Sequence, residues 1–205
     1  MKIIPPSHTF LSEPDGTALL QRLERTGRIC YKSEGKITET SYAPFLRSLL
    51  QRGHESVIEH ACLSVLIVCD RGVSHEIVRH RIASYSQEST RYCNYAQEKF
   101  GRELTFIRPC FWQEEPEKYQ IWQETMAEIE RNYFRLLDLG AAPQEARSIL
   151  PNSLKTELAV TMNLREWRHF FRLRTDAASH PQMRETACAL LEDFRARVPI
   201  LFDTL

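Results

Sequence analysis

The sequence predicts an α+β fold, a mixed β-sheet flanked by helices within a single domain. Segments of helical and of strand periodicity follow one another without the regular βα alternation of a doubly wound sheet. The length of 205 residues fits one domain, 1–205, and no Gly/Ser-rich linker, repeat or low-complexity segment divides it. The chain is 42% hydrophobic, which is enough for a substantial core and too much for a disordered protein.

Strand and helix signals follow each other irregularly along the first 80 residues. A short strand is predicted at "IIP" (3–5), and helices are predicted over 15–27 and 41–53, each closed by a glycine. The nearly continuous apolar run at 61–70 is typical of a buried strand. Helical spacing of the apolar residues in 72–80 predicts a short helix.

The middle of the chain combines a polar segment with one long helix. The stretch "RHRIASYSQESTRY" (79–92) is interpreted as a polar loop, and "LTFIRP" (104–109) as a strand. An apolar stripe predicts a long helix over Tyr119–Leu139, which a glycine stops. A short helix between prolines is predicted at 143–151, and alternating apolar residues predict a strand at 154–162.

Two helices complete the chain. Asn163 followed by Glu166 resembles an N-cap with its capping-box partner, which would open a helix over 164–174. The last helix, 181–198, carries apolar residues at helical spacing and is expected to bury that face.

Composition excludes several functional classes. The chain has 27 Lys plus Arg and 27 Asp plus Glu, and this zero net charge argues against a general nucleic-acid-binding surface. The six cysteines form no CxxC pair, and no glycine-rich phosphate loop is present, so side chains would have to hold any bound phosphate. Because no secretory leader and no membrane-length apolar run is found, we expect a cytoplasmic protein with no membrane contact.

Arginine clusters are the strongest chemical signal. One set lies in the 79–92 stretch, and another lies on the helix predicted at 164–174. A guanidinium group is a planar fork of donors that matches a phosphate or the carbonyl edge of a base. The intervening hydroxyl, amide and tyrosine side chains could bind a sugar or stack on a heterocycle. These residues favour a nucleotide or dinucleotide ligand over a metal.

Three other interpretations stay open from the residues alone. The arginines of the 164–174 helix could simply face solvent. The arginine loop could belong to a nucleic-acid-binding domain, which zero net charge disfavours. A metal-dependent nucleotide hydrolase could use histidines, although no HExxH spacing is present; its candidate residues would be His54, His60, His75 and His80.

The residues of the 79–92 stretch resemble a family signature. Arg79-His80-Arg81, seven further residues, Ser89, one residue and Arg91 match the pattern of the flavin-dependent thymidylate synthases. Three further segments are similar to those of the family: "GHESVIEH" (53–60), "ARSILP" (146–151) and "NLREWRHFFRLR" (163–174). The resemblance runs from about residue 28 to residue 176.

The resemblance implies a fold, an activity and a mode of assembly. The family makes thymidylate from deoxyuridylate (dUMP), with methylenetetrahydrofolate as carbon donor, FAD as hydride carrier and NADPH as reductant, and it releases tetrahydrofolate. The protein would be a homotetramer in which the subunits share active sites. Its partners would be the small-molecule substrate and copies of itself, with no nucleic acid and no metal.

The resemblance also implies roles for individual residues. FAD would contact Ser56, Arg79, His80, Arg81, Gln87, Asn163, Leu164, Arg165 and His169. Deoxyuridylate would contact Glu76, Ile77, Val78, Arg79, Gln87, Glu88, Ser89, Thr90, Arg91, Arg147 and Arg174. Arg174 would be the catalytic residue, since a fixed positive charge beside the uracil stabilises negative charge that develops on the ring.

Four positions depart from the commonest family pattern. Gln87 stands where some relatives carry Glu, Glu76 where some carry Gln, and Cys30 where Ser is frequent. Glu88 occupies a position that is often aliphatic. A carboxylate there cannot face a phosphate without a cation between them, so we expect the Glu88 side chain to point away from the nucleotide.

Overall fold

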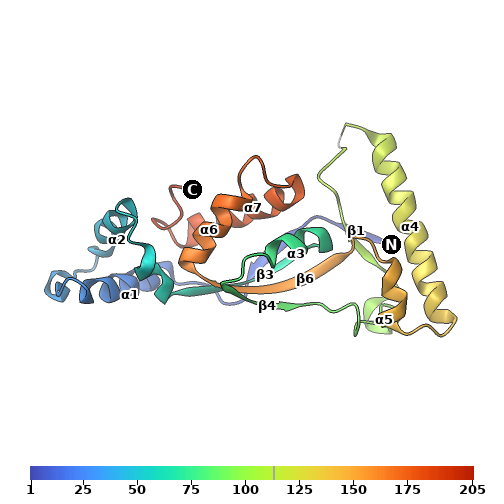
Figure 1. Ribbon diagram of the computed structural model, residues 1–205, viewed down its shortest axis with the longest axis horizontal. Helices are drawn as coiled ribbons and strands as arrows, with labels where there is room; N and C mark the ends of the chain where they lie inside the picture. Colours follow the sequence, from blue (N-terminus) through green and yellow to red (C-terminus); the bar gives the residue numbers. More distant parts are fainter. Residues whose placement is uncertain (113) are drawn as a thin grey trace. The chain divides into compact units, whose positions relative to one another are not determined.

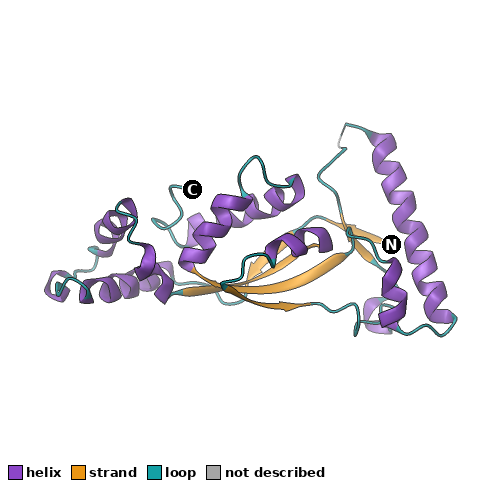
Figure 2. Ribbon diagram, in the orientation of Figure 1, coloured by secondary structure: helices purple, strands orange, loops and turns teal. Residues whose placement is uncertain are grey.

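The computed structural model describes residues 1–112 and 114–205, and it confirms the α+β class (Figures 1 and 2). The strands are β1 (Lys2–Ile4), β2 (Ser7–Phe10), β3 (Cys62–Asp70), β4 (Ala83–Gln87), β5 (Thr105–Ile107) and β6 (Lys155–Asn163). The α-helices are α1 (Gly16–Ile29), α2 (Tyr42–Gln51), α3 (Arg71–Ile77), α4 (Pro116–Asp138), α5 (Pro143–Ala146), α6 (Leu164–Arg174) and α7 (Pro181–Arg197). Short 3₁₀ helices are η1 (Glu34–Lys36), η2 (Glu55–His60), η3 (Glu98–Phe100) and η4 (Arg147–Ile149).

The strands form a four-stranded sheet in the order β2-β3-β6-β4 and a parallel pair of β1 with β5. The residues cluster into two compact units. The first unit contains Met1–Ser7, Ile67–Arg79 and Ser86–Leu158. The second contains His8–Leu66, His80–Tyr85 and Ala159–Leu205. Strands β3, β4 and β6 contribute residues to both units.

In the first unit, one face of helix α4 supplies much of the core. Pro116 occupies the first helical turn, where its missing N–H costs no hydrogen bond, so the helix begins three residues before the predicted start. Trp122, Met126 and Tyr133 recur at helical spacing and are buried. They pack in one cluster with residues such as Phe106 of β5.

In the second unit, aromatic side chains hold the core together. Trp167 of α6 is fully buried, and its ring lies 4.9 Å from Phe194 of α7 and 5.8 Å from Phe171. The Trp167 indole N–H donates to the carbonyl of Leu63 in β3 (3.1 Å), so the one polar atom of this side chain is satisfied in the core. Helix α6 packs against α7 and η2, and α1 packs against α2.

Both long strands run directly into a helix, and a polar residue marks each junction. Asp70 ends β3, and its carboxylate accepts from the backbone N–H of Val73 (2.6 Å) at the start of α3. Asn163 ends β6, and its amide oxygen accepts from the backbone N–H of Glu166 (2.8 Å) at the start of α6. Such caps satisfy helix donors that lack an intrahelical partner. The Asn163 cap therefore helps to determine where the arginine-bearing helix α6 begins.

Several predicted boundaries need correction. Gly27 does not end α1, which continues to Ile29; its missing side chain instead lets Phe45 of α2 approach closely. The segment interpreted as a polar loop contains strand β4, which pairs with β6. Strand β2 was not predicted at all. The Glu166 side chain contacts His80 rather than closing a capping box, so that part of the N-cap prediction is wrong.

No helix in residues 1–112 or 114–205 has both the length and the apolar character needed to cross a membrane.

Candidate active site

A cavity of about 490 Å³ lies in the second unit, between η2 and the first turns of α6. Most of its lining side chains are ionisable, and they come from both elements and from the segment before β4. The lining residues are Glu55, Glu59, Ile82, Asn163, Arg165, Glu166, His169 and Arg172. The cavity is therefore polar and of mixed charge rather than an apolar pocket.

Three of the residues predicted to bind the cofactor line this cavity: Asn163, Arg165 and His169. Arg165, His169 and Arg172 are spaced four and three residues apart, which places them on one face of α6. The side chains of all three are exposed, so their donors are accessible to a ligand. Helix periodicity thus gathers two guanidinium groups, one imidazole and one amide along one wall.

Glu55 organises the arginines of α6. Its Oε1 accepts from Arg172 Nη2 (2.8 Å) and from Arg168 Nε (3.3 Å), and its Oε2 lies 3.9 Å from Arg165 Nε. Burial alone would raise the pKa of Glu55, but the guanidinium groups of Arg172 and Arg168 outweigh burial and hold this pKa below its usual range. Glu55 therefore stays ionised and fixes the cationic face of the helix.

The alternative that these arginines simply face solvent is wrong for Arg168. Its side chain is buried, and it donates both to Glu55 and to the backbone carbonyl of Leu201. Arg165 is about half exposed and pairs with Glu59 (2.5 Å) at the cavity wall. Arg168 is thus structural, whereas Arg165 holds an exposed carboxylate that a ligand anion could replace.

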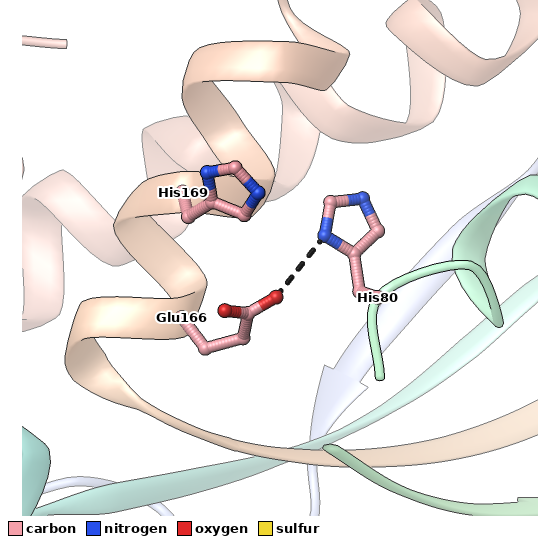
Figure 3. Close-up of side chains that lie close together, drawn as sticks. All are labelled: His80, Glu166 and His169. Atoms are coloured by element: carbon pink, nitrogen blue, oxygen red, sulfur yellow. Dashed lines mark hydrogen bonds and ion pairs between the residues drawn. The ribbon is translucent and has the colours of Figure 1, made fainter. Parts of the chain in front are cut away.

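His80 lies between Arg174 and Glu166 in a hydrogen-bonded chain, and Figure 3 draws its contact with Glu166. Arg174 Nε donates to His80 Nε2 (3.1 Å), and His80 Nδ1 lies 3.2 Å from Glu166 Oε1. Burial lowers the pKa of His80 to about 4, and the positive charge of Arg174 acts in the same direction. His80 is therefore neutral at physiological pH, and its neighbours Arg174 and His169 both favour this neutral form.

The same close-up shows a grouping with the composition of a metal site (Figure 3). His80, Glu166 and His169 offer ligand atoms within 4.8 Å of one another. However, Arg174 occupies Nε2 of His80 and Glu166 faces Nδ1, so a metal on His80 would have to displace one of these partners. The expectation that the site uses no metal stays a prediction.

In the first unit, the predicted ligand residue Gln87 is held by hydroxyl groups. Its side-chain amide nitrogen donates to Ser74 Oγ (2.9 Å) and to Thr156 Oγ1 (3.2 Å). With both amide hydrogens used in this way, the side chain keeps only its carbonyl oxygen for a ligand. A neutral amide at this position can therefore accept a hydrogen bond but has no donor left to offer.

The Glu88 side chain is bound by other side chains of the first unit. Its carboxylate accepts from the Tyr95 hydroxyl (2.7 Å) and pairs with Lys155 (3.1 Å), which also pairs with Glu157 (2.6 Å). Burial and the Glu88 carboxylate raise the pKa of Tyr95 well above its usual range, so this phenol remains a donor. The orientation of the Glu88 carboxylate relative to a nucleotide phosphate stays a prediction.

The remaining predicted residues divide between the two units. The predicted nucleotide contacts, apart from Arg174, belong to the first unit. Those with exposed side chains include Arg79, Arg91 and Arg147, whereas Ile77 is fully buried and could reach a ligand only through its backbone. The predicted FAD contacts of the second unit are Ser56, His80, Arg81, Asn163, Leu164, Arg165 and His169, and among them Leu164 is fully buried.

Three carboxylates that line the cavity, those of Glu55, Glu59 and Glu166, were not among the predicted site residues. Glu55 stands beside the predicted Ser56, and Glu166 was interpreted only as part of a helix cap. The available signal was an excess of arginines on α6, because guanidinium groups inside a fold need anionic partners. The sequence did not indicate which glutamates would supply them.

Comparison with known proteins identifies relatives over most of the chain. A family model described as "Thymidylate synthase complementing protein" matches residues 17–200. A flavin-dependent thymidylate synthase of Geobacter sulfurreducens is 34% identical over 209 residues, which cover 98% of this chain and 85% of that protein. One of Pyrococcus furiosus is 40% identical over 163 residues, 79% of this chain. That match spans 66% of the Pyrococcus protein, slightly less than two thirds.

A solved structure shares the fold. It is a UMP/dUMP methylase, PolB, of Streptomyces cacaoi bound with 5-Br dUMP, and it superposes with a TM-score of 0.83 over 99% of this chain and 96% of that chain. Its sequence identity to this chain is 21%, so this likeness concerns the fold alone. The family model and the Geobacter relative each extend over most of the sequence. This chain therefore belongs to the flavin-dependent thymidylate synthase family.

Proposed function

We propose that residues 1–205 act as one flavin-dependent thymidylate synthase domain that methylates deoxyuridylate to thymidylate. Family membership supports the reaction class, and the cavity of α6 and η2 is the observation that carries the proposal. In the full proposal methylenetetrahydrofolate supplies the carbon, FAD carries the hydride, and NADPH is the reductant. The protein would work in the cytoplasm as a homotetramer with shared active sites.

The donor set of the cavity fits a flavin dinucleotide. Arg165 and Arg172 present guanidinium groups suited to a pyrophosphate, and the Asn163 amide and the His169 ring suit the polar edge of a heterocycle. When bound, the flavin supplies the hydride that reduces the transferred carbon to a methyl group. The residues of α6 would hold and orient it.

The proposed task of Arg174 is electrostatic. Its Nε donates to His80 Nε2 (3.1 Å), and this hydrogen bond helps to hold the guanidinium in place. Placed beside the uracil, this permanent charge stabilises negative charge on the ring oxygen and makes C5 more nucleophilic. Arginine suits the task because it stays protonated at any physiological pH.

The nucleotide phosphate would be held in the first unit. Arg91 is exposed, and its backbone N–H donates to Ser89 Oγ (3.3 Å). This hydrogen bond within the loop links the two residues that are proposed to bind the phosphate. Arg147 is exposed at the start of η4. Two guanidinium groups and a hydroxyl would together match a dianionic phosphate.

Flavin uptake and turnover test the proposal together. The purified protein mixed with FAD is expected to show bound-flavin absorbance, and it should release tritium from C5-labelled deoxyuridylate when methylenetetrahydrofolate and NADPH are supplied. A folded sample that binds neither FAD nor deoxyuridylate would refute the proposal. The nucleic-acid-binding alternative is not favoured, and it predicts instead salt-dependent binding of oligonucleotides.

Two variants separate the proposed roles. Arg174→Ala should keep FAD binding and lose most of the turnover, because its proposed role lies at the uracil ring. Arg91→Ala should mainly weaken deoxyuridylate binding. Unchanged turnover in the first variant, or unchanged nucleotide affinity in the second, would contradict the corresponding assignment.

A further inference from the structure

Glu166 has no assigned role in this site, yet its placement is specific. It lies in the first turn of α6, lines the cavity, and is only 8% exposed. Its carboxylate faces the ring of His80 across 3.2 Å (Figure 3). A glutamate is rarely buried to this extent unless a partner holds it. The question is what the His80–Glu166 contact does for the site.

The neighbouring arginine decides the protonation of His80. A guanidinium group has only donors, so His80 Nε2 must present its lone pair to Arg174 Nε. A neutral imidazole that accepts at Nε2 carries its proton on Nδ1. That Nδ1–H then needs an acceptor, and Glu166 Oε1 stands at the required distance. The three side chains are therefore mutually consistent in one tautomer only.

We propose that Glu166 is a positioning residue: its carboxylate holds His80 in the Nδ1–H tautomer, and the lone pair of the unprotonated Nε2 in turn fixes the guanidinium of Arg174. The proposal rests on the proposed role of Arg174 at the uracil. Glu166 itself would touch neither substrate nor flavin ring in this role. It would act through His80, as carboxylates act on histidine in other catalytic and metal sites.

The surroundings of His80 support a fixed neutral ring. From α6, the residues that face it are Glu166, Arg174, His169 (ring centroids 5.7 Å apart) and the apolar ring of Phe170 (5.0 Å). From β4, the Tyr85 hydroxyl donates to the His80 carbonyl (2.6 Å) and holds the backbone. Burial raises the pKa of Tyr85 to about 12, so this donor keeps its proton. These contacts restrict the rotation of the His80 ring.

The first test reads the tautomer directly and needs no variant. Nitrogen-15 spectra of histidine-labelled holoenzyme distinguish a protonated from an unprotonated ring nitrogen, and His80→Asn identifies the His80 signals. We expect Nδ1 protonated and Nε2 unprotonated at neutral pH. An Nε2–H tautomer, or an imidazolium ring, would overturn the proposal whatever the activity of the enzyme.

The second test uses Glu166→Gln, which keeps the size of the side chain and removes its charge. The Gln amide can donate to Nδ1, and this stabilises the Nε2–H tautomer, which would place two donors against each other at Arg174. We expect kcat to fall about 10- to 100-fold with little change in the KM for deoxyuridylate or in flavin binding. Glu192→Gln removes an exposed carboxylate of α7 and serves as the matched control.

The two readouts separate this inference from the proposed function. If Glu166→Gln keeps the wild-type kcat, or if its His80 tautomer is unchanged while kcat falls, Glu166 is not a positioning residue. If the wild-type protein makes no thymidylate but His80 has the Nδ1–H tautomer, the proposed function fails and the role of Glu166 in orienting Arg174 remains. A merely structural role would lower flavin binding and kcat together.

Discussion

Replacing Glu55 by Gln tests whether this one carboxylate holds the arginine face of α6. The substitution keeps the shape of the side chain but removes the charge that Arg168 and Arg172 share. Arg168 is the critical partner, because its side chain is 4% exposed and cannot recruit water in place of the carboxylate. It keeps one other acceptor, the carbonyl of Leu201.

The cost follows from the burial of each pair. A hydrogen bond between charged, buried groups contributes about 1.5–3 kcal/mol. The pair with Arg172, whose side chain is 46% exposed, adds about 0–1 kcal/mol. Glu55→Gln should therefore lower the free energy of unfolding by about 1.5–4 kcal/mol. With a guanidinium m-value of about 4–6 kcal/mol/M for a chain of this size, the midpoint should fall by roughly 0.25–1 M.

The assay is guanidinium unfolding followed by circular dichroism at constant protein concentration. Glu59→Gln is the matched control, because it breaks the pair with Arg165 in which both side chains are about half exposed, and it should cost less than about 1 kcal/mol. Equal midpoint shifts in the two variants would refute the reasoning, since burial would then make no difference.

The pH dependence gives a second check. Because the folded-state pKa of Glu55 lies below its usual value of 4.5, its contribution is complete above that value and is lost as the pH falls through the folded pKa. The difference in stability between wild type and Glu55→Gln should therefore be largest above about pH 5 and shrink in acid. A difference that grows on acidification would mean that the carboxyl is not held in its ionised form.

Three further predictions concern the packing. Gly16→Ala should lower stability by about 2 kcal/mol or more in thermal unfolding, because a Cβ there meets the backbone carbonyl of Arg197; an unchanged melting temperature would disprove this close approach. Trp167→Ala should cost about 3–5 kcal/mol in guanidinium unfolding, because it empties the aromatic core and leaves the Leu63 carbonyl without its donor. Burial raises the pKa of the Cys69 thiol, so mass spectrometry should find this residue unalkylated in the native protein and alkylated in denaturant; rapid native labelling would contradict its burial.

Helices with their own caps were predictable from local sequence. Asn163 opens α6 where its side chain predicted, and the apolar stripe of α4 faces the core. These features depend on hydrogen bonds and contacts within one or two helical turns, which the sequence encodes directly. The Arg79-His80-Arg81 pattern and its spacing to Ser89 and Arg91 likewise indicated the family, which the comparisons confirm.

Strand β4 was missed for a physical reason. Residues 83–87 have little apolar periodicity of their own, and they are extended because they pair with β6, to which the sheet order assigns them. Strand formation depends on a partner that is distant in sequence, so a polar edge strand is easily interpreted as a loop. The misplaced end of α1 has the same origin, since the packing of Phe45 against Gly27 is a tertiary contact.

The sequence by itself determined the family, the helices and the set of arginines and histidines from which the site is built. Only the tertiary structure decided which charges meet: Glu55 reaches Arg168 across 113 positions, and Glu166 reaches His80 across 86. Burial and long-range partners decide whether a guanidinium group stabilises the fold or can bind a ligand. They also decide whether a histidine is neutral or charged. Neither property is present in any short stretch of sequence, because both depend on atoms that only folding brings together.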